Sequence, residues 1–526
     1  MLNLTPDQRS LGRANAQEVI GSTRRDFLKA AAVAPAMGAF YFGYQPMGDK
    51  PPVKAAVIGT GDEGCQAMIR YHNRDYVDYI GMCDIRPSQL ERGVKEFAAH
   101  KQYGPGDAAK IKKYDDVDAM LADPDVEMVV IALPLWLHAP VAIQAMKANK
   151  HVFCEKLMAH NIGQCKEMVK VARDKNKLLA VGHQRHYSAL YDNANYLVQE
   201  GHLGEIRHIR ALWHRNNAVP QIEKDSAGKL AYDDKGNPVY KKDKAGNVLY
   251  FDSWKKPTPE ADKDVDFKKY GYKSLEELVC WRLFNRTGAG LMAELGSHQL
   301  DACSIFLGKK HPLAVTGIGG TFFYTDGREV DDHVFVNFEF PGKAENDHTV
   351  VSYSSINTNA FETYGEELMG TRGTMIVEGE KEILLYKEID RNTWKPGDGN
   401  AKTTSVTVET KAGGKPTVEA SPSAAGPSSA ATYGALATAD PSRGYREELE
   451  HFAYCIRHAN TSNVHDVPDK DKPRCRGEVA LADAVIALTS NIAMHQKRRI
   501  EFKPSWFDWQ SPDVPENDAS QLASKA

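Results

Sequence analysis

The stretch that decides the fold is "VKAAVIGTGDEGCQAMIRYH", residues 53–72. It begins as an apolar run of strand length and continues with apolar residues at helical spacing. Between the two parts, Gly59, Gly61 and Gly64 have GxGxxG spacing. The first glycine allows a tight turn, the second lets the backbone approach a phosphate, and the third lets the helix pack on the strand. The stretch therefore predicts a strand–turn–helix unit with a phosphate-binding turn.

A second strand is expected at residues 76–84, and Asp84 ends it. An acidic residue about twenty positions after the glycine turn accepts hydrogen bonds from an adenosine ribose and repels a 2′-phosphate. This favours NAD as the dinucleotide. Arg86 could offset the repulsion, so NADP remains open. A purely structural glycine turn is the alternative.

Strands and helices continue to alternate after this unit. The expected elements are a strand at 126–134, a helix at 138–150, a strand at 151–156, a helix at 161–177 and a strand at 178–185. Repeated units with apolar strands predict a doubly wound parallel sheet, whose ligands bind at the carboxyl ends of its strands. Glu155 and Lys156 lie at such an end, so their polar groups are expected to face a crevice.

Two further motifs accompany the glycine turn: "LPLWLHAPVAIQAMKANKHVFCEK" at 133–156 and "GAGLMAELGSHQLD" at 288–301. Together they resemble the Gfo/Idh/MocA family of nicotinamide-dependent sugar and cyclitol oxidoreductases, over residues 53–310 and more loosely near the C-terminus. The resemblance implies an N-terminal Rossmann sheet followed by an α+β domain with a large, mostly antiparallel open sheet. It also implies a small-molecule sugar or cyclitol substrate and a homo-oligomer that forms through the open face of the second sheet.

The same resemblance suggests Lys156, Glu294 and His298 as the catalytic residues. Oxidation of a secondary alcohol needs a proton acceptor, and the ordinary pKa of histidine suits His298 to that role. Lys156 would stabilise the developing negative charge on the oxygen. Glu294 and Asp301 lie on the same helical face as His298, so a carboxylate could orient its imidazole.

The motifs depart from the family pattern at two positions. Leu157 stands where the family has proline, which removes a backbone restraint next to Lys156. Glu294 replaces an aspartate. Other interpretations exist: Lys156 could be a solvated lysine paired with Glu155, and Glu294, His298 and Asp301 could be metal ligands. We predict no metal, because the dinucleotide already supplies redox chemistry.

Further contacts are predicted from position along the chain. Pro134, His138 and Glu155 follow strand ends and are expected near the dinucleotide. For His138, a simple role at a helix N-terminus is the alternative.

Arg185, Trp213, Arg215 and Asp301 are predicted to bind substrate, although the aromatic and basic cluster after residue 206 could equally be packing. The HxxH pair formed by His183 and His186 is interpreted as crevice lining or packing rather than a metal site.

The domain boundaries follow from these patterns. The expected parts are a Rossmann domain at 50–186, a substrate-binding α+β domain at 187–505 with insertions at 220–275 and 397–443, and a frayed tail at 506–526. Three loosely repeated Gly-turn units at 225–250 predict a small β meander. The 220–275 insertion could be a lid or an oligomer contact. The Gly-, Ser- and Ala-rich 397–443 segment reads as a flexible excursion.

Residues 1–45 resemble a twin-arginine (Tat) export signal, with Arg24 and Arg25 before a short Ala-rich apolar run. The alternative is a basic patch before a short helix. We expect export to the periplasm by the Tat machinery, with small residues at 34–36 offering a cleavage point and membrane anchoring if the signal is retained. Tat cargo travels folded, so a tightly bound dinucleotide could travel with it.

The composition excludes some function classes. The chain has 526 residues, a formal charge of -4, 42% hydrophobic and 26% charged residues. No basic strip for nucleic acid is present. The eight cysteines lack CxxC spacing, so buried thiols are expected. Three hypotheses remain: a sugar or cyclitol dehydrogenase, a redox-neutral glycoside-cleaving enzyme that forms a transient keto-sugar, and a non-catalytic dinucleotide-dependent binding protein.

Overall fold

The computed structural model describes residues 4–20, 42–225, 228–242, 246, 248–388, 443–459 and 462–518, and the short strands β16 (Val408–Glu409) and β17 (Thr417–Val418). The predicted twin-arginine motif and nearly all of the 397–443 segment lie outside these residues.

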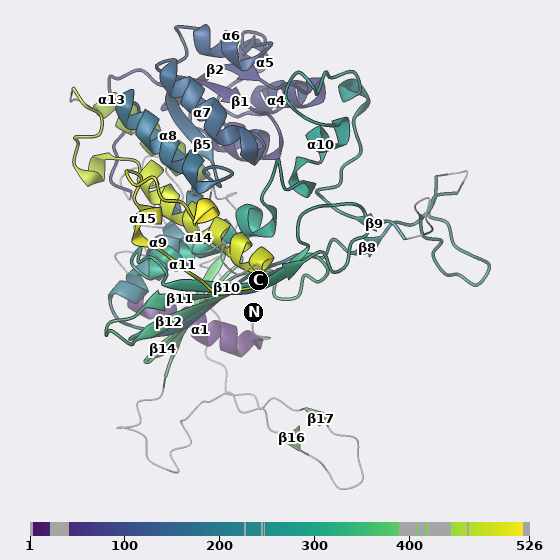
Figure 1. The fold of residues 1–526 in the computed structure, drawn as a ribbon, viewed down its shortest axis with the longest axis vertical. Helices are drawn as coiled ribbons and strands as arrows, with labels where there is room; N and C mark the ends of the chain where they lie inside the picture. The colour runs from purple at the N-terminus through teal and green to yellow at the C-terminus, as the bar shows by residue number, and fades with distance from the viewer. Residues whose placement is uncertain are drawn as a thin grey trace.

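A six-stranded parallel sheet forms the N-terminal domain (Figure 1). Its strands, in the order β3-β2-β1-β4-β5-β6, are β3 (Lys112–Lys113), β2 (Val77–Cys83), β1 (Val53–Ile58), β4 (Met128–Ile131), β5 (His151–Glu155) and β6 (Leu179–Gly182). β1 pairs with both β2 and β4. The strand order therefore reverses beside β1, which creates a crevice at the carboxyl ends of β1 and β4.

Helices cover both faces of this sheet because successive β1 residues point to opposite sides. Ala56 and Ile58 belong to the core that contains residues of α7 (His138–Lys147) and α8 (Ile162–Asp174). Ala55 and Val57 belong to a second core with residues of η1 (Gly64–Ile69) and α13 (Tyr445–His458). The remaining helices of the domain are α4 (Pro87–Ala99), α5 (Pro105–Ala108), α6 (Val117–Ala122), η2 (Leu135–Leu137) and η3 (Gln184–Tyr187).

An eight-stranded sheet forms the second domain, in the order β15-β14-β13-β7-β12-β11-β10-β18. The strands are β7 (Ile206–His214), β10 (Ala314–Gly320), β11 (His333–Pro341), β12 (His348–Ile356), β13 (Tyr364–Gly370), β14 (Gly373–Glu378), β15 (Glu382–Lys387) and β18 (Ile500–Glu501). Only the β7–β12 pair is parallel. The predicted fold class, a Rossmann sheet followed by a large, mostly antiparallel sheet, is confirmed.

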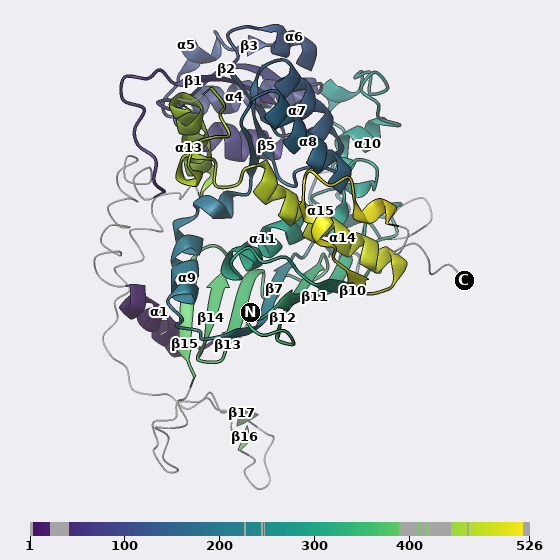
Figure 2. The same ribbon diagram turned by 60° about the vertical axis from the view of Figure 1, so that its left-hand side comes forward.

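Three helices cover one face of the second sheet, as Figure 2 shows: α9 (Ala189–Gln199), α11 (Ser297–Phe306) and α14 (Gly477–Gln496). Helix α14 also contacts α8, and the Val181 amide donates to the Cys475 carbonyl at 2.9 Å just before α14. In the described chain, α14 alone is long and apolar enough to span a bilayer, yet its most apolar window is 72% buried. It is the core helix that joins the two domains.

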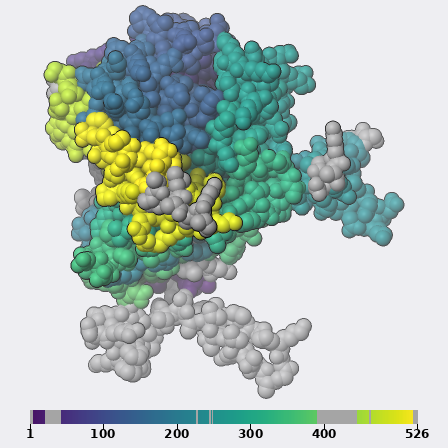
Figure 3. Space-filling view, in the orientation of Figure 1, coloured from purple at the N-terminus to yellow at the C-terminus, as the bar shows by residue number. Residues whose placement is uncertain are grey.

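The 220–275 insertion forms an arm, which runs to residue 251, and a return segment, residues 252–275. In the arm, β8 (Val219–Pro220) pairs with β9 (Tyr250–Phe251), and antiparallel bridges such as Lys224–Leu230 and Tyr232–Pro238 form the predicted meander. The arm projects from the body (Figure 3). The return segment carries η4 (Glu260–Asp262), and α10 (Leu275–Val279) and η5 (Trp281–Leu283) follow it beside the Rossmann domain.

The two ends of the described chain are packed. α1 (Pro6–Ile20) lies against β15. The prediction that the tail frays from residue 506 is wrong for residues 506–518, which include η8 (Pro515–Asn517). Trp506, in α15 (Pro504–Phe507), is fully buried, and the Lys166 ammonium donates to the carbonyls of Ser505, Ser511 and Asp513. The buried indole and these three hydrogen bonds anchor the segment. The short helix η7 (Asp469–Asp471) lies between α13 and α14.

Candidate active site

A large cleft lies between the two domains, at the carboxyl ends of β1 and β4. Of the predicted site residues, it is lined by Gly59, Gly61, Asp84, Arg86, Pro134, His138, Glu155, Lys156, Trp213, Arg215, Glu294 and His298. The structure therefore brings together predicted site residues from Gly59 to His298, which come from both domains.

The glycine turn has the geometry of a phosphate cradle. Gly59 has φ +91°, and a Cβ there would lie 2.3 Å from the Ala132 carbonyl oxygen. A Cβ on Gly64 would lie 2.1 Å from the Gly59 oxygen, so this glycine permits close packing of helix and strand. Gly61, by contrast, has no atom within 4 Å of a Cβ position. Open space beside Gly61 fits the pyrophosphate of a dinucleotide.

Asp84 and Arg86 occupy the adenosine end of the cleft. The Asp84 carboxylate accepts hydrogen bonds from the backbone amides of Thr60 at 2.8 Å and Arg86 at 2.9 Å. Burial raises its pKa, whereas these two donors oppose the rise. The Arg86 guanidinium pairs with Asp262 of the return segment at 2.9 Å. Arg86 is therefore already neutralised by a carboxylate that is fully buried.

His138 fixes the backbone on either side of the cleft. Its Nδ1 lies 2.8 Å from the Leu157 oxygen and its Nε2 lies 2.9 Å from the Leu133 oxygen. Burial lowers its pKa. The Lys156–Leu157 peptide bond, at the position where the family has proline, is cis. His138 thus joins the loop after β4, which contains Pro134, to the loop after β5.

Glu155 is 4% exposed, and its Oε1 has no hydrogen-bond partner in the described chain. Burial and the nearby Glu63 raise its pKa to about 8, against the opposing charge of Lys156. Glu155 is therefore predominantly neutral near pH 7, which argues against the alternative interpretation that Lys156 is simply a solvated lysine paired with Glu155. The ammonium of Lys156 points instead to the second domain.

Lys156 and Glu294 connect the two domains. The Lys156 ammonium donates to the Glu294 backbone oxygen at 2.7 Å, and the Glu294 carboxylate accepts from Arg282 Nε at 2.6 Å. Burial opposes the charge of Glu294, but Arg282 outweighs it and lowers the pKa. Glu294 lies in the short π-helix η6 (Met292–Gly296), directly before α11. Such π-helical turns are frequent at functional sites.

His298 lies one turn after Glu294, with its ring centroid 5.5 Å from that of Trp213. Burial and the charge of Lys156 lower its pKa well below the ordinary value, so the imidazole is neutral. The expectation that Glu294 or Asp301 orients this ring is wrong. Glu294 pairs with Arg282, and Asp301 accepts from His186 at 2.9 Å and Lys309 at 2.8 Å.

Asp301 and Arg185 belong to a buried ion network, not to the cleft lining. We define this network as Arg185, His186, Asp301, Lys309 and Glu366. Arg185 lies 3.5 Å from Glu366 and is 2% exposed. Burial disfavours the charged form of Asp301, but its cationic neighbours lower its pKa well below the ordinary range. These contacts correct the prediction that Arg185 and Asp301 bind substrate.

Potential metal donors gather at the edge of this network. His183, Asp301 and Asp483 converge, as do His186, Cys475 and Asp483. The Lys309 ammonium already lies 2.8 Å from Asp301 and 3.8 Å from Asp483. Burial raises the pKa of Asp483 well above its ordinary value. The single anion Asp301 is thus balanced by a lysine of the chain.

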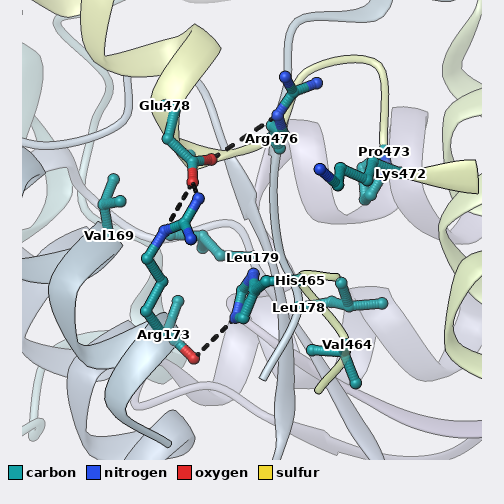
Figure 4. Close-up of a pocket in the computed structure, with 12 residues that line it drawn as sticks. Val169, Arg173, Leu178, Leu179, Val464, His465, Lys472, Pro473, Arg476 and Glu478 are labelled. Carbon is teal, nitrogen blue, oxygen red and sulfur yellow. Dashed lines mark hydrogen bonds and ion pairs between the residues drawn. The ribbon is translucent and has the colours of Figure 1, made fainter. Parts of the chain in front are cut away.

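A second, smaller pocket lies between α8 and the start of α14 (Figure 4). Arg173 pairs with Glu478, and His465 hydrogen-bonds the Ala172 oxygen at 3.2 Å. Arg173 and Arg476 share Glu478, Lys472 pairs with Asp469 outside the pocket, and none of the predicted site residues lines it.

Sequence reasoning missed Arg282, Trp254, Tyr445 and Asp262. All but Asp262 line the cleft, and Asp262 holds Arg86. They come from the insertion, from the segment after it and from the start of α13, where no motif marks them. The only available signal in the sequence was that Arg86 would need an acidic partner. The chain has too many acidic residues for this signal to identify Asp262.

Comparisons with known proteins agree with this architecture. Residues 53–183 match the model "Oxidoreductase family, NAD-binding Rossmann fold" and residues 268–376 match "GFO/IDH/MocA C-terminal domain". Inositol 2-dehydrogenase of Salmonella typhimurium is 26% identical over 177 residues, 33% of this chain and 50% of that protein. The chain thus spans about half the length of this relative. A glycosyl hydrolase family 109 protein of Shewanella baltica is 27% identical over 210 residues, 36% and 45% of the two chains.

Among solved structures, an inositol dehydrogenase homologue of Azotobacter vinelandii, complexed with NADH and myo-inositol, has a TM-score of 0.54. It is 13% identical, and the likeness covers 86% of this chain and 98% of that one. At this identity the likeness establishes the fold. Both domain models and the order of the motifs lead to one assignment: the chain belongs to the Gfo/Idh/MocA oxidoreductase family.

Proposed function

We propose that this protein transfers hydride between NAD and a secondary alcohol of a sugar, sugar derivative or cyclitol, and that it acts after export. The observation that carries the proposal is the meeting of Lys156, Glu294 and His298 beside the glycine turn, in one cleft. A non-catalytic binding protein would not need a neutral imidazole and an ammonium group there.

The residues divide the chemistry between them. His298 is neutral and therefore can accept the proton of the substrate hydroxyl. Lys156 is held by the Glu294 carbonyl oxygen and can stabilise negative charge on the reacting oxygen. The bound nicotinamide supplies the hydride acceptor. Arg282 keeps Glu294 ionised, which offsets the positive charge of Lys156.

We further propose that NAD is retained between turnovers. The return segment contacts the dinucleotide site twice, through Asp262 with Arg86 and through Lys256 with Asp62 of the glycine turn at 2.5 Å. The Asp62 carboxylate is also paired with Arg92, and these partners lower its pKa to about 2 although burial opposes them. Retention suits an exported enzyme, because free NAD is scarce outside the cytoplasm. The twin-arginine motif supports periplasmic export.

A second candidate is redox-neutral glycoside cleavage through a transient keto-sugar. Its support is the similarity to the glycosyl hydrolase family 109 protein. In this reaction the leaving group is eliminated from the keto-sugar, water adds to the resulting double bond and the same hydride then returns to the ketone, so the retained NAD undergoes no net change. Both candidates use Lys156 and His298.

We also propose a homo-oligomer built on the outer face of the second sheet. Four apolar side chains are exposed there, one on each of β10, β11, β12 and β13: Ile318, Phe335, Val350 and Met369. Exposed apolar faces of this kind favour protein contacts.

The test is mass spectrometry of small molecules released when the purified exported protein is denatured. Stoichiometric NAD supports the proposal. Sugars and cyclitols are then screened by the absorbance of the reduced nicotinamide, and glycosides by release of the leaving group. A protein that is empty and does not bind added NAD would refute the proposal.

A further inference from the structure

Four arginines line the cleft, and three of them are neutralised by carboxylates. Arg86 pairs with Asp262, Arg282 with Glu294 and Arg443 with Glu380, the last at 3.3 Å. Arg215 is different. Within the described chain, no carboxylate oxygen lies in ion-pair distance of its guanidinium. A cation of the protein is thus left unbalanced inside the cleft.

Neutral groups hold Arg215 in place. Its Nη2 and Nε donate to the Asn357 Oδ1 at 2.9 and 3.3 Å, and its guanidinium lies 4.6 Å from the centre of the Trp254 ring. Both bonds use one edge of the guanidinium, and no described residue accepts a hydrogen bond from Nη1, so Nη1 can bind a ligand. The side chain is therefore fixed before any substrate arrives, which lowers the entropic cost of binding.

The nearest acidic groups already have partners. Asp252 accepts from Arg328 Nη2 at 2.6 Å, and Glu294 accepts from Arg282. Burial lowers the pKa of Arg215, although Asp252 and Glu294 oppose the fall. Desolvating a cation is costly unless an anion compensates for it. The arrangement is accordingly completed by an anion from outside the chain.

The position of Arg215 relates that anion to the reacting centre. Trp213 lies in β7 two residues before Arg215, which directly follows the end of that strand, and both residues line the cleft. Trp213 stacks on Tyr364 with ring centroids 4.5 Å apart and also contacts His298. A sugar ring stacked on Trp213 would place one substituent near His298 and another near Arg215.

We propose that the substrate is an acidic sugar, and that Arg215 binds its anionic group. The group is a carboxylate, as in a uronic acid, or the chemically similar oxyanion of a sulfate or phosphate ester. A guanidinium binds such groups with two parallel hydrogen bonds. This inference rests on the proposed function and adds a substrate class to it. A neutral sugar would leave Arg215 unpaired.

The test compares matched sugars on the purified holoprotein: glucose with glucuronate, galactose with galacturonate, and glucose with its 6-sulfate and 6-phosphate. We expect kcat/KM to favour one class of acid over its neutral partner by about 100-fold, and only that acid to raise the melting temperature. The preferred acid distinguishes carboxylate from ester. Equal preference for neutral sugars overturns the inference and leaves the proposed function intact.

Two other outcomes are also decisive. Stabilisation by an acid without any change in the nicotinamide supports the inference and overturns hydride transfer to that sugar. No stabilisation and no reaction with any sugar in the panel overturns the acidic-sugar inference. NAD release on denaturation reports separately on the cofactor.

Three variants localise the effect. Arg215→Gln should reduce the acid preference to within about 3-fold, whereas Arg215→Lys should retain part of it. Asn357→Asp supplies a carboxylate of the same shape to Arg215 and should also abolish the preference, with Arg215 still present. Arg499→Gln, at an exposed pair with Glu339, is the control and should leave the preference unchanged. An unchanged preference in both Arg215→Gln and Asn357→Asp would refute the role of Arg215.

Discussion

The cleft and the buried ion network contain the same kinds of residue within a few positions of each other along the chain. His298 and Asp301 lie on the same helix, α11. In the network, Asp301 is bound by His186 and Lys309. In the cleft, His298 and Arg215 have no ion-pair partner among the described residues, although Arg215 is hydrogen-bonded to Asn357. The comparison teaches that exposure to the cleft and the lack of an ion-pair partner, rather than residue type, distinguish the candidate site from the network.

The largest expected effect is on the buried side. Asp301→Asn should lower the free energy of unfolding by about 3 kcal/mol, because it leaves Lys309 without its closest anion. The value lies at the low end for buried pairs, since Lys309 is 35% exposed. Chemical denaturation measures it. The control is Asp483→Asn, which should cost less than about 1 kcal/mol because burial and the neighbouring Asp301 raise the pKa of Asp483 and favour its protonated form. Equal losses of unfolding free energy in Asp301→Asn and Asp483→Asn would contradict the prediction that Asp301 is the main anionic partner of Lys309.

The next effect is on the cleft side. His298→Ala should lower turnover by about 100-fold or more while NAD stays bound and stability is nearly unchanged. Steady-state kinetics and released NAD measure the two properties. Full turnover in this variant would move the acid/base role away from His298.

A third prediction concerns the neutral carboxyl group in the cleft. The pKa of Glu155 rises from 4.5 to about 8 on folding, so the folded state holds a proton that the unfolded state releases. Stability from this group is complete below pH 4.5 and falls as the pH rises toward 8, by up to about 1.4 kcal/mol per pH unit. Glu155→Gln should flatten that fall. Denaturation curves at several pH values measure it, and parallel curves for the two proteins would contradict the prediction.

The smallest effect concerns the cofactor. Asp262→Asn frees Arg86 from its carboxylate and should shift the ratio of affinities toward NADP by about 3- to 10-fold, up to about 1.4 kcal/mol. Titration of the emptied protein with both dinucleotides measures the ratio. Asp326→Asn, which alters another aspartate that pairs with an arginine, is a control and should not change it. A ratio unchanged in Asp262→Asn would mean that Asp84 alone sets the preference.

The sequence predicted the fold because its patterns are local. The glycine turn, the apolar strands and the alternation of elements depend on neighbouring residues, and the structure has them. It did not predict the ordered residues 506–518, since Lys166 lies 339 residues from Ser505 and 347 residues from Asp513, the residues to which it donates.

The candidate site was predicted only in part for the same reason. Lys156 and His298 are marked by motifs and line the cleft. Arg185 and Asp301 also lie in or near predicted motifs, but in the structure they are buried and pair with Glu366 and Lys309. Asp262 contacts Arg86 and Ser88, and Asn357 contacts Arg215, across more than 140 positions of sequence. Contacts between such distant residues produce no periodic pattern in the sequence.

Helix α1 has a consequence for the sheet that it touches. Arg9 pairs with Glu378 and Glu382, the Tyr386 hydroxyl donates to the Gln8 carbonyl, and Gly12 packs against the Tyr386 ring. The helix precedes the small residues at 34–36, so if the proposed export signal is cleaved there, α1 would be removed with it. The processed protein would then present β15 as an uncovered edge strand, with Glu378 at the end of β14 and Glu382 in β15 no longer paired with Arg9. Removal of α1 would therefore expose a strand edge that could pair with another strand, and the negative charge of the two glutamates would oppose such pairing.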